Sequence, residues 1–196
     1  MAKVIDECIK RQLEKDMDFF LKYFPVRIRN VGNDAVKARE LIWAFKDGKE
    51  EAQEQVAQMT AAYLKEKHGR HMETNEVVLV CVPASTQEQN EKRYEWFCGR
   101  VSELCGVKNG FPYLRVVGDR LAVHEHRHGN ERTKTIDKVQ IIEFDDDYFF
   151  GKDVVVMDDV VTTGTSYALF AAQLENCHAN VLGGVFLART HYRYGK

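Results

Sequence analysis

The chain has 196 residues, of which 44% are hydrophobic and 30% charged, and its formal net charge is −2. These values are typical of a globular protein with a sizeable core, and they exclude the global basic field that attracts nucleic acid or an anionic membrane. The first residues are charged, no apolar run approaches the ~20 residues that span a bilayer, and five scattered cysteines form no C-x-x-C pair. We therefore expect a cytoplasmic protein with free thiols, no membrane association and no evident nucleic-acid binding.

The first third of the chain has a helical pattern. Apolar residues recur every three to four positions across residues 5–24 and stop before Pro25, which cannot continue a helix. Two further helices are predicted over residues 33–47 and 49–69, each closed by a glycine. No catalytic constellation stands out here, so we interpret the region as a scaffold or hood.

From residue 77 onward, short β-branched runs alternate with helical patterns. This alternation predicts an α/β fold, a three-layer parallel sheet flanked by helices, with ligands bound at the carboxyl ends of the strands. We accordingly divide the chain into a helical region, 1–76, and an α/β domain, 77–196. The predicted strands are VVLVCV, YLRVVG, KVQIIEF, DVVVMD and NVLGGVFLA, and the predicted helices are EKRYEWFCGRVSELCG and GTSYALFAAQLENCHA.

The stretch VVVMDDVVTTGTS, residues 154–166, carries the most chemistry. It places Asp158 and Asp159 at the carboxyl end of an apolar strand, ahead of a hydroxyl-rich glycine turn and a helix. Such a turn presents backbone N–H groups and the positive end of the helix dipole to a phosphate. Carboxylates repel phosphate, so these two would serve the vicinal hydroxyls of a sugar or a hydrated Mg²⁺. The pattern therefore predicts a ribose-phosphate ligand, with its phosphate in the turn formed by Thr162, Thr163, Gly164, Thr165 and Ser166.

A hydrolase was the rival interpretation of the same stretch. GTSYA approximates the G-x-S-x-G nucleophile elbow, with Ser166 as the nucleophile. That fold needs an acid and then a histidine later in the chain. No aspartate follows Ser166, and Glu175 lies on the same predicted helix. We therefore reject a hydrolase.

Residues 154–166 closely resemble the phosphoribosyl diphosphate (PRPP) signature of type I phosphoribosyltransferases. The resemblance implies a parallel-sheet domain, a mobile loop over the site, a small region that holds the acceptor, and Mg²⁺ bound with the diphosphate. By this match Asp158 and Asp159 are the catalytic pair that binds the ribose hydroxyls, and one of them meets the metal through water. Thr162 to Ser166 would bind the 5′-phosphate.

A narrower resemblance, to a diverged competence-factor (ComF-like) branch, is carried by WAFKDG and by VPAST…KRYEWFCGRVSEL. It implies a loop that meets the diphosphate, with Lys92 and Arg93 as its basic partners. The chain lacks the cysteine-rich metal ribbon of that branch, and KRYEW is only loosely like its arginine-glycine-phenylalanine-asparagine run. The loop residues implied are Pro83, Ala84, Ser85 and Thr86.

Two features leave alternatives open. Purine-salvage members often have a proton-handling aspartate where this chain has Thr162, and threonine is no general base at neutral pH. The stretch from 119 to 138 is basic and rich in histidine, with His124, His126 and His128 at alternating positions. We interpret it as a mobile loop rather than a metal site; Arg127, Arg132 and Lys134 either close over the diphosphate or are simply solvated.

The expected activity is transfer of a phosphoribosyl group from PRPP, with Mg²⁺, to a nitrogen acceptor, either a nucleobase or an amine. Diphosphate is the expected leaving group, and the protein would act in nucleotide metabolism. The alternative is a non-catalytic, competence-related regulator that binds PRPP or a nucleotide. A homodimer is left open.

Overall fold

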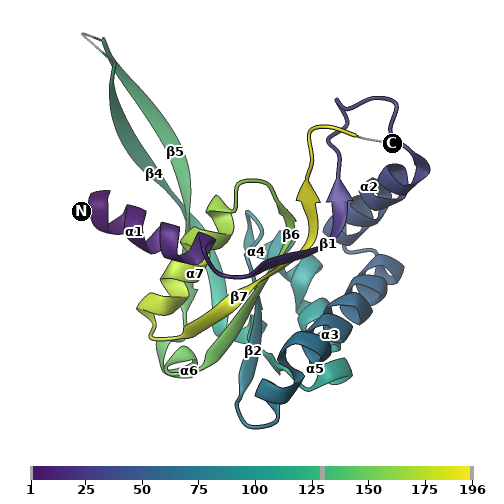
Figure 1. The fold of residues 1–196 in the computed structure, drawn as a ribbon. Helices are drawn as coiled ribbons and strands as arrows, with labels where there is room; N and C mark the ends of the chain where they lie inside the picture. The colour runs from purple at the N-terminus through teal and green to yellow at the C-terminus, as the bar shows by residue number, and fades with distance from the viewer. Residues whose placement is uncertain (1, 129–130, 195–196) are drawn as a thin grey trace.

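A five-stranded, wholly parallel sheet forms the centre of the molecule (Figure 1). The computed structural model describes residues 2–128 and 131–194, and the side chains of residues 7–118 and 140–194. The predicted α/β class with a parallel sheet is confirmed. In sheet order the strands are β1 (Met17–Tyr23), β7 (Asn180–Thr190), β6 (Asp153–Val161), β2 (Val77–Cys81) and β3 (Lys108–Asn109).

Helices cover both faces of the sheet, which gives the three layers (Figure 1). One face carries α2 (Asn33–Lys46), α3 (Glu50–Met72) and α5 (Trp96–Cys105), and the other carries α1 (Ala2–Leu13), α6 (Asp146–Phe149) and α7 (Thr165–Asn176). Because successive strand residues point to opposite faces, Leu79 and Met157 enter one core cluster while Val80 and Val156 enter the other. Three short helical elements follow β2 along the chain: α4 (Gln87–Asn90), the π-helical η1 (Glu91–Glu95) and the 3₁₀ turn η2 (Phe111–Tyr113).

The helix predicted over residues 5–24 is wrong in its second half. Helix α1 ends at Leu13, and Met17–Tyr23 is the edge strand β1, paired with β7. The aromatic residues of MDFFLKY suit a strand as well as a helix face, and pairing with β7 decides between the two. The N-terminal region is therefore not wholly helical, and the division of the chain at residue 77 stays a prediction.

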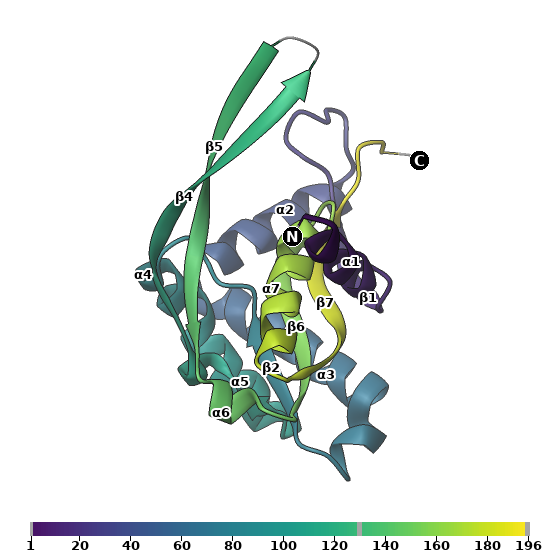
Figure 2. The same cartoon turned by 90° about the vertical axis from the view of Figure 1, so that its left-hand side faces the viewer.

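The prediction of a loop over residues 119–138 is also wrong, because the backbone there is in strands. Two long strands, β4 (Leu114–His128) and β5 (Glu131–Phe144), form an antiparallel ribbon outside the main sheet. The ribbon runs away from the body of the molecule (Figures 1 and 2). The runs YLRVVG and KVQIIEF, predicted as strands of the parallel sheet, form the base of this ribbon and pair antiparallel with each other. Leu114 and Val116 are buried there, and Phe144 packs against the same core cluster as Leu114.

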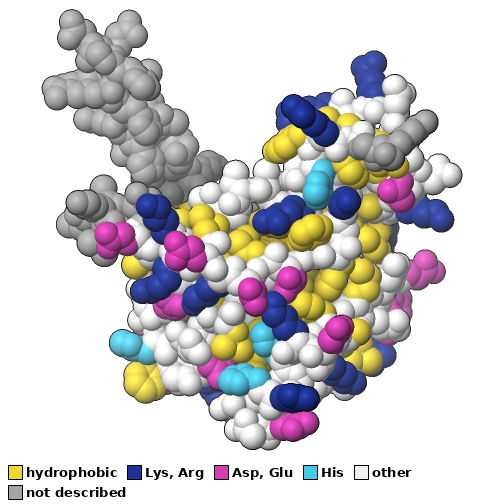
Figure 3. All heavy atoms as spheres, in the orientation of Figure 1, with side chains coloured by type: hydrophobic (Ala, Val, Ile, Leu, Met, Phe, Trp, Pro, Cys, Tyr) yellow, Lys and Arg dark blue, Asp and Glu magenta, His cyan; other side chains and the backbone are white. Residues whose placement is uncertain are grey.

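The carboxyl ends of β2, β6 and β7 meet at one edge of the sheet, since all three strands run parallel. The carboxyl ends of all five strands lie at this edge, and the segments considered below are the connections β2 to α4 and β6 to α7, together with the end of β7. On the face shown in Figure 3, basic and acidic side chains are interspersed rather than grouped by sign. Within the part of the chain that the structure describes, no helix is long and apolar enough to cross a bilayer.

Candidate functional site at the carboxyl edge of the sheet

The turn between β6 and α7 encloses a hollow of about 120 Å³. Thr162, Thr163, Gly164, Thr165 and Ser166 all line it, so the structure brings together every residue predicted for the phosphate. Gly164 has a φ of +83° and caps α7, whose first residue is Thr165. The Oγ1 atoms of Thr163 and Thr165 lie 2.9 Å apart. The hollow thus combines hydroxyl groups with the N-terminus of a twelve-residue helix, an arrangement suited to an anion.

Asp158 lies in the wall of this hollow. One carboxylate oxygen, Oδ1, accepts a hydrogen bond of 2.7 Å from the backbone N–H of Asp159. Burial, followed by the negative charge of Asp159, raises the pKa of the Asp158 carboxyl above its usual range. The carboxyl therefore retains a proton at a higher pH than a solvated aspartate would.

Asp159 faces a different set of partners. It is 6% exposed, and Arg93 donates to its Oδ2 at 2.8 Å while the Lys46 ammonium lies 3.1 Å from its Oδ1. The two adjacent carboxylates therefore diverge, as neighbouring strand residues do: one lines the hollow and the other is held by two cations.

The loop from Pro83 to Thr86 lies beside these carboxylates, because the backbone N–H of Val82 extends the β2–β6 pairing to Met157 at 2.8 Å. Ala84 is fixed through its N–H by the side chain of Asn90. Thr86 caps α4 by accepting from the N–H of Gln89. Ser85 is exposed. The loop is thus at the predicted edge, and its contact with a diphosphate stays a prediction.

Of the two predicted basic partners, the structure brings one to the carboxylates. Arg93 reaches Asp159, whereas Lys92 is exposed and packs through its backbone carbonyl, which accepts from Gln53 Nε2 at 3.1 Å. Both residues lie in the π-helical segment η1. A π-turn leaves carbonyls outside the ordinary α-helical pattern, and Gln53 also bonds the carbonyl of Arg93 at 2.9 Å.

Two residues at the site were missed by sequence reasoning. Lys46 comes from the last turn of α2, in the region interpreted as scaffold; it lies within the run WAFKDG, which predicted no role for it. Thr190, the last residue of β7, lies 2.7 Å from Thr162 between hydroxyl oxygens. Its position after a predicted strand was the one available signal, because carboxyl ends of parallel strands meet at one edge.

The predicted mobile-loop residues lie on the ribbon: Arg127 on β4, and Arg132 and Lys134 on β5. Their side chains lie outside the described residues, as do those of the three histidines. The choice between a loop that closes over a diphosphate and a solvated one stays open.

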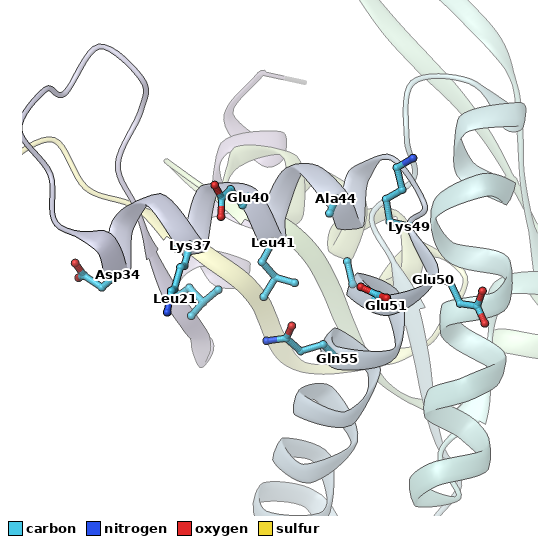
Figure 4. A pocket seen from close by; sticks show the side chains of 12 residues that line it. Leu21, Asp34, Lys37, Glu40, Leu41, Ala44, Lys49, Glu50, Glu51 and Gln55 are labelled. Carbon is cyan, nitrogen blue, oxygen red and sulfur yellow. The ribbon is translucent and has the colours of Figure 1, made fainter.

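A larger hollow, of about 890 Å³, lies between α2 and α3 beside β1 (Figure 4). Its lining combines Leu21, Leu41 and alanines with charged side chains of both signs. None of the predicted site residues lines it. We therefore place the candidate site at the sheet edge, where hydroxyls, carboxylates and cations converge.

The two carboxylates are also candidate ligands for a metal ion. Among the residues that the structure describes, no group of three histidine, cysteine, aspartate or glutamate side chains is arranged to hold an ion. Mg²⁺, however, usually keeps several waters and takes one or two carboxylates together with substrate phosphates. Asp158, in the wall of the hollow, is placed to supply one such carboxylate beside a bound phosphate.

Comparisons with known proteins found structures but no sequence relatives. No family model and no curated protein matches the chain. A hypoxanthine phosphoribosyltransferase from Staphylococcus aureus matches with a TM-score of 0.39 and 17% identity over 71% of this chain; the match spans 64% of that protein, less than two thirds of it. The adenine phosphoribosyltransferase of Saccharomyces cerevisiae matches with a TM-score of 0.46 and 14% identity, covering 96% of this chain and 90% of that one. A purine phosphoribosyltransferase from Pyrococcus horikoshii has a TM-score of 0.35 and 12% identity, with coverages of 89% and 94%.

Proposed function

We propose that the protein is a Mg²⁺-dependent phosphoribosyltransferase that transfers the phosphoribosyl group of PRPP to a nitrogen acceptor. The observation that carries the proposal is the hollow between β6 and α7, in which a hydroxyl-rich turn and a helix N-terminus share a wall with Asp158. A ribose 5-phosphate needs both kinds of group: donors for its phosphate and an acceptor for its hydroxyls.

In this proposal each part of the site serves one part of PRPP. The turn from Thr162 to Ser166 binds the 5′-phosphate. Asp158 and Asp159 accept from the ribose hydroxyls, and Arg93 with the loop from Pro83 to Thr86 meets the diphosphate. Mg²⁺, held through the diphosphate and one carboxylate, would neutralise the leaving group.

The reaction breaks the bond between C1 of the ribose and the diphosphate oxygen, and the bonding electrons leave with the diphosphate. A nitrogen lone pair then forms the new bond to C1, and the proton on that nitrogen passes to solvent or to a base. The chain's own contribution would be positioning and electrostatic stabilisation rather than covalent catalysis.

A ligand sensor is the second candidate, and Thr162 favours it. Where a proton-handling aspartate would help deprotonate an acceptor, the Thr162 hydroxyl is instead bonded to Thr190 at 2.7 Å. A sensor needs the same PRPP site without a base. An acceptor that is already a free amine or a base anion would remove the need for one as well.

Diphosphate release distinguishes the two candidates. The protein is incubated with PRPP and Mg²⁺ and a panel of nucleobases and amines, and released diphosphate is measured beside PRPP binding. Acceptor-dependent release supports the transferase, and binding without release across the panel supports the sensor. A protein that neither binds PRPP nor releases diphosphate refutes both.

A further inference from the structure

Two cations share one nearly buried carboxylate at the site. The side chain of Asp159 is 9% exposed, that of Arg93 17% and that of Lys46 38%. Lys46 is therefore the more accessible of the two cations to an anion that arrives from solvent.

The fold fixes the place of Lys46 through its backbone. Arg93 Nε donates to the Lys46 carbonyl at 3.4 Å. Gly48, with a φ of +67°, lets the turn after α2 pass so close to η1 that an added Cβ would lie 2.7 Å from the Lys92 carbonyl oxygen. The Gln53 amide secures the same segment from α3. The turn after α2 and the segment that bears Arg93 are thus locked together beside Asp159.

A simpler role for Lys46 must be weighed. A lysine in the last turn of a helix is favoured by the helix dipole alone, and α2 ends at Lys46. The dipole accounts for a lysine at this position. It does not account for an ammonium that lies 3.1 Å from a carboxylate on a central strand.

We infer that Lys46 is a diphosphate-binding residue and that Asp159 exchanges partners when PRPP binds. Without ligand, Lys46 and Arg93 hold the carboxylate. With PRPP, the two cations turn to the diphosphate, and the freed carboxylate accepts from the ribose hydroxyls. This inference rests on the proposed function, and it assigns to the N-terminal region a direct part in binding.

Two ligands separate this role from a structural one. PRPP carries the diphosphate, whereas ribose 5-phosphate carries the same hydroxyls and 5′-phosphate without it. Both are titrated calorimetrically with Mg²⁺ into the wild type, Lys46→Met, Lys46→Arg and the control Lys49→Met, which removes an exposed lysine three residues further on. Thermal unfolding shows that each variant is folded.

We expect Lys46→Met to weaken PRPP at least about tenfold while ribose 5-phosphate binds as well as before or more tightly, because one counter-ion of Asp159 is gone. Lys46→Arg should restore most of the difference, and Lys49→Met should change neither affinity. Equal losses for both ligands, or no loss for PRPP, would overturn the inference and leave the proposed function standing. A wild type that binds neither ligand would refute the proposed function and this inference with it.

A structure of the wild-type complex with PRPP and Mg²⁺ gives a second test that needs no variant. The Lys46 ammonium should lie on the diphosphate and away from Asp159. An ion pair between Lys46 and Asp159 that survives in the complex would overturn the inference.

Discussion

Gly164 shows at the residue scale why the turn between β6 and α7 needs glycine. Its φ of +83° lies in the left-handed region, and an added Cβ would lie 2.7 Å from Leu13 Cδ2 and 2.9 Å from Met17 Cε. Leu13 ends α1 and Met17 begins β1, so the N-terminal segment packs directly against the turn. The backbone conformation is the main requirement for glycine; packing adds a smaller one, because an added Cβ would displace only the flexible ends of Leu13 and Met17.

The substitution Gly164→Ala tests both requirements. We expect it to lower the free energy of unfolding by about 1–3 kcal/mol and to weaken PRPP binding, as measured by denaturant unfolding and calorimetry. Gly106→Ala is the matched control, because Gly106 has a φ of +81° and an added Cβ there meets nothing within 4 Å. Equal stability losses in the two variants would show that the contact with Leu13 and Met17 carries no weight.

Asp158 illustrates a conflict between stability and binding. Burial and the charge of Asp159 raise the pKa of its carboxyl, so the folded protein binds the proton more tightly than the unfolded chain does. The favourable contribution of this group is complete below the unfolded-state pKa of about 4 and is lost as the pH rises through the folded-state pKa. Because the folded-state pKa is raised to about 8, the carboxyl stays mostly protonated in the ligand-free fold at pH 7 while the unfolded chain releases the proton, so the group lowers the free energy of unfolding there relative to pH 4.

We accordingly expect Asp158→Asn to raise the melting temperature at pH 7 by more than at pH 4, while it weakens PRPP binding. Differential scanning calorimetry at the two pH values measures the first effect. Asp153→Asn, at the other end of β6, should instead lower the melting temperature, because Asp153 bonds His71 and Asn180, each at 2.6 Å. A melting temperature for Asp158→Asn that is unchanged or lowered at pH 7 would contradict the account.

At the scale of elements, α1 is fastened to α7 by charged contacts. Glu175 on α7 bonds Arg11 and Lys15, each at 2.5 Å, and Lys15 also reaches the carbonyl of Val181 at 2.6 Å. Burial alone would raise the pKa of Glu175, but the hydrogen bonds from Lys15 and Arg11 bring it below its usual range. Helix α1 ends at Leu13, beside the turn between β6 and α7. The carboxylate of Glu175 on α7 thus holds α1 in place.

The substitution Glu175→Gln should loosen α1. A carboxyl group whose pKa is lowered by folding stabilises the fold at pH values above its unfolded-state pKa. This stabilisation is lost as the pH falls through the folded-state pKa, so the wild type should lose the same contact in acid. We expect hydrogen exchange in residues 7–13 to rise roughly fivefold at pH 7, equivalent to about 1 kcal/mol. Glu103→Gln, which removes an exposed partner of Arg100 on α5, should leave this exchange unchanged. Unaltered exchange in Glu175→Gln would show that packing alone holds α1.

The helices and strands that could be predicted are those whose sequences are compatible with only one type of secondary structure. Strands β2 and β6 contain runs of buried β-branched residues, and β7 is buried and apolar through most of its length, so local pattern and tertiary environment agree. Helix α3 was predicted as a helix, but it continues past the predicted terminator Gly69 to Met72. β1 was missed because its aromatic residues fit a helix face and its partner β7 lies at the other end of the chain. The ribbon β4–β5 was predicted only at its base, as the separate strands YLRVVG and KVQIIEF, because the sequence between them shows no apolar alternation.

The same reasoning explains what could be foreseen of the site. The turn from Thr162 to Ser166 is local, since strand, glycine and helix follow one another in sequence, and it could be placed from residues alone. The run WAFKDG contains Lys46, but lysine is ordinary at a helix end, so the residues around it do not predict that it reaches Asp159 across the fold.

At the scale of the whole molecule, the parallel sheet gathers at one edge groups that are far apart in the chain. The turn after β6, the loop after β2 and the end of β7 meet there because the strands run in one direction. Lys46 on α2, through its ion pair with Asp159, and α1, through Leu13, add contributions from the other side of the sequence. The candidate site therefore depends on the N-terminal region as well as on the residues after 77.

Calorimetric titration of PRPP in the presence of Mg²⁺, into the wild type and Asp159→Asn, tests the central claim most directly. The account predicts saturable binding at one site per chain in the wild type, weakened at least about tenfold by Asp159→Asn with the fold retained in thermal unfolding. An absence of saturable binding by the wild type, or equal affinity in the wild type and Asp159→Asn, would contradict it.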